Sequence, residues 1–587
     1  MATRIGWSPG PANWVDDLSP LPAAEWNDER AAHLLHHAGF GGTPADVRRL
    51  AALGLEGAVR HLVHYERVPN PRMQPFVESG LWDPSLKGFP ESRPEATDRA
   101  EKSGVSMGVE TKPSGNRPVQ PVSDRFFYWL RATMLETRRV GYWWANRMVQ
   151  TTHPLEQKMA LFWHGHFATH ENKVRDYRKM LQQIDLFERG ATGNVRELTV
   201  KVAQNPAMLY FLDAQYNVKG APNENFAREV MELFTMGVGH YSEQDVREAA
   251  RAFTGWYFDD LAFKVDPARH DAGTKTFLGR TGPFDGVDVV RIIFEQPVTA
   301  EFLAAKIYRF LVRDGLSPAL RAKLGAVLRQ HDYEVKPLLT AIFSSKDFYS
   351  QASYGGHIKG PVEHLVAMVR QLGADELPGV PDFNQSTIAM GQHLLNPPSV
   401  AGWAGGKAWI TPGLLMARGN VARDVLTPDM TGFRDWNFSA GSDDVLGRRL
   451  RDGYDIGAAT APSDPSKMSE FDRAALERDE RFNTRISGYI GWQQAARKLI
   501  PTPRQAARFD LTRLVLDDGA ATTAEAVDSL LGRLVRIPVA PAMREALVSF
   551  LTKELGTDRL DRAKTYLEDP LRLTAHLIMS TPEYQLV

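Results

Sequence analysis

The chain has no cysteine among its 587 residues. This absence excludes thiolate nucleophiles, disulfides, iron–sulfur clusters and cysteine-ligated zinc. Any bound metal would therefore depend on histidine, carboxylate or carbonyl ligands. An excess of charge is lacking too, because 70 Lys and Arg residues stand against 71 Asp and Glu residues. With no basic stripe and no acidic tail, we expect neither a nucleic-acid partner nor a membrane partner.

Long apolar runs are also missing. No window approaches the roughly 20 apolar residues that cross a bilayer, and residues 1–17 contain no apolar signal-peptide core. The sequence therefore predicts a cytoplasmic protein, although removal of an export signal would leave the same kind of N-terminus. A P-loop, a Rossmann glycine cluster and a Gly-x-Ser-x-Gly motif are all absent, so we expect no nucleotide cofactor.

Helical patterning dominates what is present. Thr43 is placed to cap a helix, Pro44 suits its first position, Asp46 suits its third, and Gly54 is expected to end it. Comparable apolar spacing recurs through most of the chain, whereas the aromatic and apolar residues between 254 and 278 favour a small β-hairpin. The predicted fold is mainly α, a multi-helix, bundle-like body with a small β-hairpin and long irregular insertions.

The length of the chain predicts several packed units rather than one. Two stretches rich in proline, glycine, serine and charge interrupt the helical pattern and are typical of lids, insertions or linkers. The predicted organisation is an N-terminal helical region (1–65), an irregular insertion (66–122), a main helical body with the candidate site (123–426), an irregular linker (427–500) and a C-terminal helical unit (501–587).

Several motifs occur in a fixed order along the chain. They are Ala38-Gly39-Phe40-Gly41, Phe162-Trp163-His164-Gly165-His166-Phe167, the block from Pro222 to Gly237, Lys359-Gly360-Pro361-Val362-Glu363, and the stretch from Asn396 to Trp403. With these motifs the chain resembles the bacterial family called domain of unknown function 1800. The resemblance implies no particular reaction. Members are often encoded beside a second family that resembles alkaline phosphatases and sulfatases, which implies a partner of that kind or a shared pathway.

The first candidate constellation is His164-Gly165-His166. Two imidazoles on one side of an extended backbone can hold one metal ion, whereas residues two apart in a helix point nearly opposite ways. Chelation therefore requires the helix that begins near Pro154 to end at about Trp163, which Gly165 would permit. The alternative is that both rings bond backbone carbonyls in an aromatic core. Some members of the family carry His where Phe234 stands, and this difference counts against a metal ligand there.

The second constellation lies on the helix predicted after Asn223. At about 100° per residue, one arc of about 140° gathers three carboxylates, an amide and a guanidinium, while apolar residues fill the other side. Two carboxylates three positions apart could share a metal ion or a proton. The alternative is an ordinary solvated ionic face. The polar residues of this arc are Glu224, Asn225, Arg228, Glu229 and Glu232.

Two loop elements are candidates for substrate binding. His270, Asp271 and Lys275 could bind an anionic group, although a capped turn explains them equally well. Trp403 and Trp409 stand in a stretch rich in glycine and proline and could stack against sugar rings, although buried packing would also explain them.

These observations predict an enzyme acting on a polar small molecule, either a carbohydrate or a phosphorylated or sulfated compound. A divalent metal (iron, manganese, copper or zinc) held by His164, His166, Glu229 and Glu232 would make it a metal-dependent hydrolase or an oxidoreductase. Glu224 and Arg228 would assist the same carboxylates in catalysis. One alternative is a metal-free acid–base enzyme of the glycosidase kind. The other is a non-catalytic helical scaffold that binds a partner enzyme.

Overall fold

The computed structural model describes residues 9–82, 120–428, 484–503 and 505–587. Most of the predicted irregular segments 66–122 and 427–500 lies outside these residues. The described chain is mainly helical, as predicted, with two short β-hairpins. No helix in this described part is both long and apolar enough to cross a membrane.

The N-terminal region confirms the helix signals around Thr43. The Thr43 side chain accepts a hydrogen bond from the Asp46 N–H, and the Asp46 carboxylate accepts one from the Thr43 N–H. These two reciprocal bonds form a capping box. Gly54 has a φ of +68° and separates two helices. The elements here are η1 (Ala12–Trp14), η2 (Ala23–Glu25), α1 (Asp28–His37), α2 (Pro44–Ala51), α3 (Gly54–Val63) and η3 (Tyr65–Arg67).

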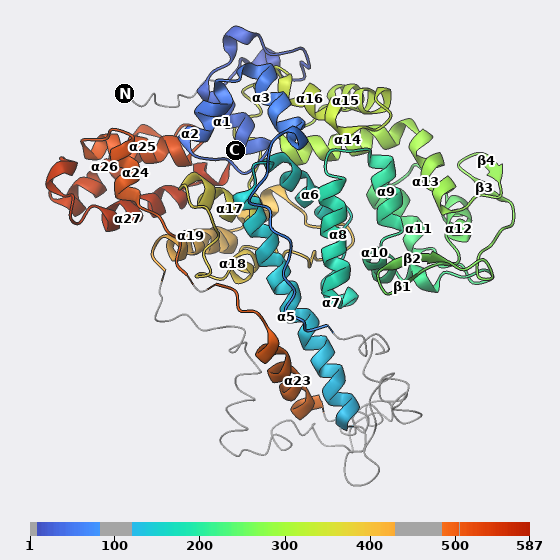
Figure 1. Cartoon of the computed structure of the whole chain (residues 1–587). Coiled ribbons are helices and arrows are strands. Elements are labelled where there is room, and N and C mark those ends of the chain that lie inside the picture. The colour runs from blue at the N-terminus through green and yellow to red at the C-terminus, as the bar shows by residue number, and fades with distance from the viewer. Residues whose placement is uncertain (1–8, 83–119, 429–483, 504) are drawn as a thin grey trace, which may run out of the picture.

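The first half of the body begins with α5, a helix of 31 residues. It extends away from the body, as Figure 1 shows. The elements are α5 (Gln120–Gln150), α6 (Pro154–His166), α7 (Glu171–Val174), α8 (Tyr177–Arg189), α9 (Val195–Ala203), α10 (Pro206–Phe211), η6 (Ala214–Tyr216), α11 (Asn225–Glu229), η7 (Val230–Thr235) and α12 (Glu243–Ala252).

The predicted β-hairpin is confirmed, and a second one follows it. Strands β1 (Trp256–Asp259) and β2 (Ala262–Val265) pair antiparallel with Trp256 opposite Val265. Strands β3 (Lys275–Phe277) and β4 (Arg280–Gly282) form the second pair. Both hairpins lie at the end of the molecule away from the C-terminal helices in Figure 1.

The remaining helices complete the body and the C-terminal region. In the body they are α13 (Gly286–Glu295), α14 (Pro297–Leu311), α15 (Pro318–Gln330), α16 (Val335–Ser344), α17 (Pro361–Gln371), α18 (Phe383–Ala389), η8 (Gly406–Ile410) and α19 (Pro412–Leu426). Near the C-terminus they are α23 (Thr484–Lys498), α24 (Leu511–Asp517), α25 (Thr523–Leu534), α26 (Pro541–Leu555), η11 (Leu560–Arg562), α27 (Glu568–Met579) and η12 (Glu583–Gln585).

One hydrophobic core joins the three predicted helical regions. Its buried residues come from all three regions, from Leu21 near the start to Tyr584 near the end of the chain. The chain end is tied in as well, because the Val587 N–H donates to the His357 carbonyl over 2.9 Å. The N-terminal region, the body and the C-terminal helices therefore share apolar packing rather than burying separate cores.

Helix α23 corrects part of the prediction for 427–500, where an irregular linker was expected. It packs along α5, and Figure 1 shows the two helices side by side. Buried Trp492, Ala495 and Leu499 meet Phe126 and Leu135 in a second, smaller core. Periodicity within the segment is weak, and the apolar face of α5 supplies the partner that stabilises the helix.

Candidate functional site

The His-x-His motif does not take the chelating geometry. Helix α6 continues through His166, so the end at Trp163 that chelation requires is not present and the two rings point to different sides. His164 Nε2 accepts a hydrogen bond from the Leu395 N–H at 3.1 Å. His166 Nε2 lies 3.0 Å from the carbonyl oxygen of Phe234 and donates to it. Both rings bond the backbone inside an aromatic core, which is the alternative that the sequence left open.

Burial also sets the charge of these two rings. It lowers the pKa of His164 to about 3 and that of His166 well below its usual range. Among the described residues, no group of three His, Asp or Glu side chains is arranged to hold a metal ion. The predicted ligand set of His164, His166, Glu229 and Glu232 is therefore not assembled in this structure.

The acidic helix contains a change of helical type. After α11 the backbone widens into a π-helix, η7, which covers Val230–Thr235. The Thr235 hydroxyl donates to the Val230 carbonyl at 2.5 Å, and the Met236 N–H donates to the Met231 carbonyl at 2.8 Å. π-helical turns are rare and are frequent at functional sites. The turn changes the spacing of the side chains that the sequence placed on one regular helix.

Two side chains from other helices hold the end of η7. Lys306 of α14 donates from Nζ to the carbonyl of Leu233 at 3.1 Å, and His166 of α6 donates to the carbonyl of Phe234 at 3.0 Å. Burial lowers the pKa of Lys306 to about 8. These donors satisfy carbonyls that the end of a helix leaves without partners. The position of the acidic residues is therefore coupled to α6 and α14.

The polar residues after Asn223 form what we call the acidic face, consisting of Glu224, Arg228, Glu229 and Glu232. Arg228 is held by Glu243 of α12 in a two-pronged contact of 2.8 and 2.7 Å and by Glu224 at 3.3 Å. These carboxylates raise the pKa of Arg228 further. Its charge is consequently neutralised within the protein.

The two carboxyl groups nearest η7 lie in different environments. Glu232 Oε2 accepts a hydrogen bond of 2.6 Å from the Tyr241 hydroxyl. Glu229 is half-buried and has no hydrogen bond or ion pair to any residue in the described part of the chain. Burial raises the pKa of Glu229, the charge of Glu232 adds to this rise, and Arg228 opposes it. Carboxyl groups whose environments differ in this way are typical of acid–base pairs.

The residues predicted for substrate binding take other roles. Lys275 is buried and donates from Nζ to the carbonyls of Asp271 and Gly273, at 2.5 and 3.0 Å. His270 Nδ1 bonds the Thr254 carbonyl at 2.8 Å. Asn225 is exposed.

Asp271 completes the same turn. Its carboxylate accepts from Arg251 and from the Gly273 N–H, both at 2.8 Å, and Arg251 lowers the pKa of Asp271 to about 2. The trio therefore forms a capped turn, which was the alternative to an anion site.

The two tryptophans differ in exposure. Trp409 is 8% exposed, so its predicted stacking against a sugar is wrong and the packing alternative holds. Trp403 is half-buried and meets the His164 ring edge to face, with 5.4 Å between ring centroids. A Cβ at Gly402, where φ is +78°, would overlap the carbonyl oxygen of Gly165. Glycine therefore lets the loop lie directly on the end of α6.

A second charged cluster, the Glu363 network, was not predicted as a site. Glu363 of α17 forms an ion pair with Lys158 of α6, lies 3.2 Å from His357 Nε2 and accepts from the Gly360 N–H at 2.7 Å. Burial alone would raise the pKa of Glu363, but Lys158 and His357 lower it well below its usual range. Lys158 and Glu363 are both buried, so the network joins helices inside the core and presents no surface to a substrate.

Sequence reasoning missed three residues of the acidic site. Tyr241 and Glu243 stand directly before and at the start of α12, and Lys306 comes from the more distant α14. Helical-hairpin packing of α12 against the acidic helix could have suggested the first two. No sequence pattern indicates Lys306, because its role depends on the tertiary contact with η7.

Fold and site together define a mainly helical protein with an acidic face that runs along α11 onto a π-helical turn. A family model described as a protein of unknown function, DUF1800, matches residues 33–586. The chain belongs to this DUF1800 family. No curated protein and no solved structure matches it.

Proposed function

We propose that the chain is an enzyme that carries out general acid–base chemistry on a polar, uncharged substrate at the acidic face. Glu229 is the group that gives up and regains a proton, and Glu232 is its ionised partner. One observation carries this proposal: Glu229 is half-buried and unpaired within the described residues, while Glu232 is held by Tyr241. An unpaired carboxyl with a raised pKa keeps its proton closer to neutral pH and can donate it.

The charges favour an uncharged substrate over a phosphorylated or sulfated one. Four carboxylates lie on or beside the acidic face, and its guanidinium is already bound by two of them. Lys306 donates to a backbone carbonyl. An anionic substrate would meet repulsion from these carboxylates, because Arg228 and Lys306 already have partners. A carbohydrate, whose hydroxyl groups accept and donate hydrogen bonds, fits this environment better.

In the hydrolytic reaction that we propose, Glu229 protonates the leaving oxygen as the bond to it breaks. Glu232 takes the second role, either by accepting a proton from the attacking water or by attacking the carbon directly. Water supplies the hydroxyl and the proton that are added across the cleaved bond. Tyr241 keeps Glu232 in position during both steps.

The test is release of reducing ends from a panel of neutral oligosaccharides by the whole chain. Glu229→Gln is expected to lower kcat at least 100-fold, since general acid catalysis typically contributes about 10²–10⁴-fold. Glu56→Gln is the matched control, because Glu56 pairs with Arg60 on the surface of α3. Unchanged melting temperatures would show that both variants fold.

Two results would contradict the proposal. If Glu229→Gln retains the activity of the parent, the acidic face is not the site. If a chelator abolishes activity and manganese, iron, copper or zinc restores it, the metal-dependent hypothesis replaces the metal-free one.

A further inference from the structure

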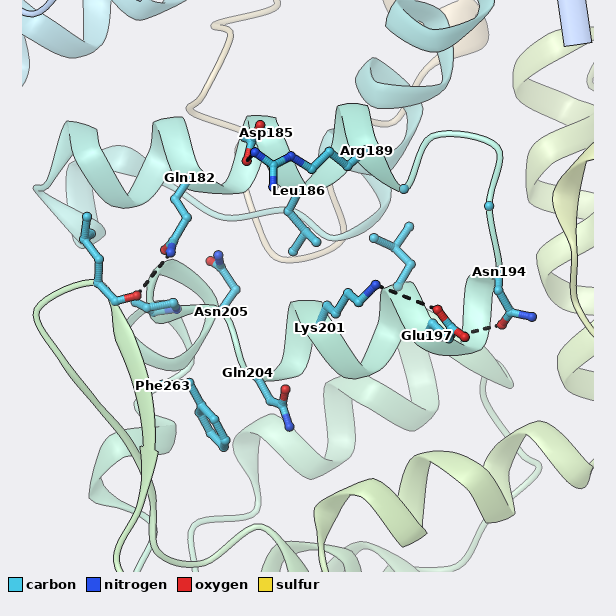
Figure 2. Close-up of a pocket in the computed structure, with 15 residues that line it drawn as sticks. Gln182, Asp185, Leu186, Arg189, Asn194, Glu197, Lys201, Gln204, Asn205 and Phe263 are labelled. Atoms are coloured by element: carbon cyan, nitrogen blue, oxygen red, sulfur yellow. Dashed lines mark hydrogen bonds and ion pairs between the residues drawn. The ribbon is translucent and has the colours of Figure 1, made fainter. Parts of the chain in front are cut away.

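A groove of about 450 Å³ lies between α8, α9 and the β1–β2 hairpin. Figure 2 shows the side chains that line this groove. None of its lining residues belongs to the acidic face or to the Glu363 network. The volume falls within the range of small-molecule and oligosaccharide sites, about 300–1,000 Å³.

The groove is built on well-packed elements. A Cβ at Gly190 would lie only 2.8 Å from Leu198 Cδ1, so the end of α8 packs closely on α9. The hairpin is tied to α8 because Gln182 Nε2 donates to the Leu261 carbonyl at 3.1 Å. Asn205 caps α10 by accepting from the Ala207 N–H at 3.0 Å. These contacts hold the walls in place without a ligand.

Three amide side chains in the groove keep unused hydrogen-bonding capacity. Gln182 Oε1 is buried and has no partner in the described part of the chain. Asn205 is 5% exposed, and its Nδ2 has no partner among the same residues. Gln204 has no side-chain hydrogen bond to any described residue. Buried polar groups are normally paired, so the buried Gln182 Oε1 indicates a missing polar partner, whereas the half-exposed Gln204 has its amide free for a ligand.

The other lining residues carry equal numbers of positive and negative charges, and some of them are apolar. Arg189 pairs with Asp185 at 2.9 Å and Lys201 pairs with Glu197 at 3.8 Å, so the charges cancel in pairs. Half-buried Phe263 of β2 lines the groove together with the amides, as Figure 2 shows. The edge-to-face contact with Trp256, at 5.1 Å between centroids, orients its ring.

We propose that this groove binds a neutral oligosaccharide. An amide side chain offers a donor and an acceptor side by side, which suits pairs of ring hydroxyl groups. An aromatic ring such as Phe263 stacks on the apolar face of a sugar. The balanced charges give no advantage to an anionic ligand. The site goes beyond the reaction proposed above, because binding here does not require Glu229.

The experiment applies the whole chain, fluorescently labelled, to an array of neutral gluco-, manno- and xylo-oligosaccharides together with sulfated and uronic-acid glycans. The strongest neutral oligosaccharide is then titrated by calorimetry. Phe263→Ala and Gln204→Ala are each expected to raise Kd at least tenfold. Tyr216→Ala, an exposed aromatic outside the groove, is expected to leave Kd unchanged.

The outcomes separate this site from the proposed reaction. Glu229 does not line the groove, so Glu229→Gln is expected to bind with the parent Kd, and this result supports the groove whether that variant hydrolyses the oligosaccharide or not. Binding to no neutral glycan, binding only to anionic glycans, or a Kd unaffected by both groove variants would overturn the proposal. Phe263→Ala removes a packing contact of the hairpin, and Gln204→Ala keeps the test independent of that effect.

Discussion

The acidic face and the Glu363 network both gather ionisable side chains, yet they differ in burial and in the pairing of their charges. In the Glu363 network the charges are buried and matched, with Lys158, His357 and the Gly360 N–H all directed to one carboxylate. At the acidic face the groups are half-exposed, and Glu229 is unmatched among the described residues. Satisfied buried charges stabilise one arrangement of helices, whereas an unsatisfied accessible carboxyl is available for chemistry.

Acid should destabilise the folded protein chiefly through its buried histidines. Burial lowers the pKa of the six buried histidines below their unfolded value of about 6.5. Below pH 6.5 the unfolded chain therefore binds protons that the folded chain does not, and stability falls with pH. The six histidines are His33, His36, His37, His164, His166 and His364.

Carboxyl groups with raised pKa values act in the other direction. Burial raises the pKa values of Glu29 and Glu171 to about 7, so these groups take up protons in the folded chain first as pH falls. The histidines outnumber these carboxyl groups, so unfolding takes up protons on balance, and each proton changes the free energy of unfolding by about 1.4 kcal/mol per pH unit. Denaturant titrations at several pH values should place acid unfolding between pH 4.5 and 6.5. Constant stability from pH 6.5 to 5.5 would contradict the expectation.

His364→Leu sharpens this measurement. Both ring nitrogens of His364 are buried and lack hydrogen-bond partners among the described residues. The substitution removes one proton uptake on unfolding. The slope of stability against pH should therefore fall by about 1.4 kcal/mol per pH unit. Glu229→Gln should leave this slope nearly unchanged between pH 5.5 and 6.5.

Breaking the ion pair of the Glu363 network should have the next largest effect. Lys158→Met leaves the Glu363 carboxylate buried with His357 as its remaining side-chain partner, and the expected cost is about 3–5 kcal/mol of unfolding free energy. Arg60→Met, which removes an exposed pair on α3, should cost less than about 1 kcal/mol. Urea denaturation measures both. Similar losses of unfolding free energy in the two variants would show that the buried Lys158–Glu363 pair contributes no more than the exposed Arg60–Glu56 pair.

Lys306 connects the acidic face to the core and gives a smaller expected effect. Lys306→Met leaves the carbonyl of Leu233 without its donor, which should cost about 1–3 kcal/mol of stability. Because the end of η7 is then less well held, kcat on a hydrolysed oligosaccharide should fall while KM changes little. Lys306→Gln keeps a hydrogen-bond donor and should recover part of kcat. Equal kcat values in the parent and Lys306→Met would remove its positioning role.

Much of the fold follows from local signals, because helices depend on spacing and capping within a few residues. The Thr43–Asp46 capping box and the β1–β2 hairpin illustrate this. Helix α23 was missed because its stability depends on α5, more than 300 residues earlier in the chain, and on no strong periodicity of its own.

The site was predictable only in part. The helix after Asn223 placed Glu229 and Glu232 on one face, but the π-helical turn and the contact from Lys306 are tertiary features. The metal site predicted from the His-x-His motif is not formed, because α6 continues for one further turn and the two rings point to different sides. The groove lined by Gln204 and Phe263 joins segments whose sequences carry no shared motif.

The smallest expected effect tests Glu229 without any substrate. Its folded-state pKa is raised above the unfolded value of about 4.5, so the folded chain holds this proton more tightly. The stability that this proton contributes is complete below pH 4.5 and is lost as pH rises through the folded-state pKa. Glu229→Gln stays neutral, so it should gain stability relative to the parent between pH 4.5 and 7.

This gain should be no more than about 1 kcal/mol, because Glu229 is only half-buried and solvent screens its charge. Denaturation of both proteins at matched pH measures it, and Glu56→Gln, fully on the surface, should show no such trend. A difference that runs in the opposite direction would mean that Glu229 is stabilised as a carboxylate. The acidic face would then resemble the Glu363 network, and its unmatched carboxyl would no longer distinguish the two.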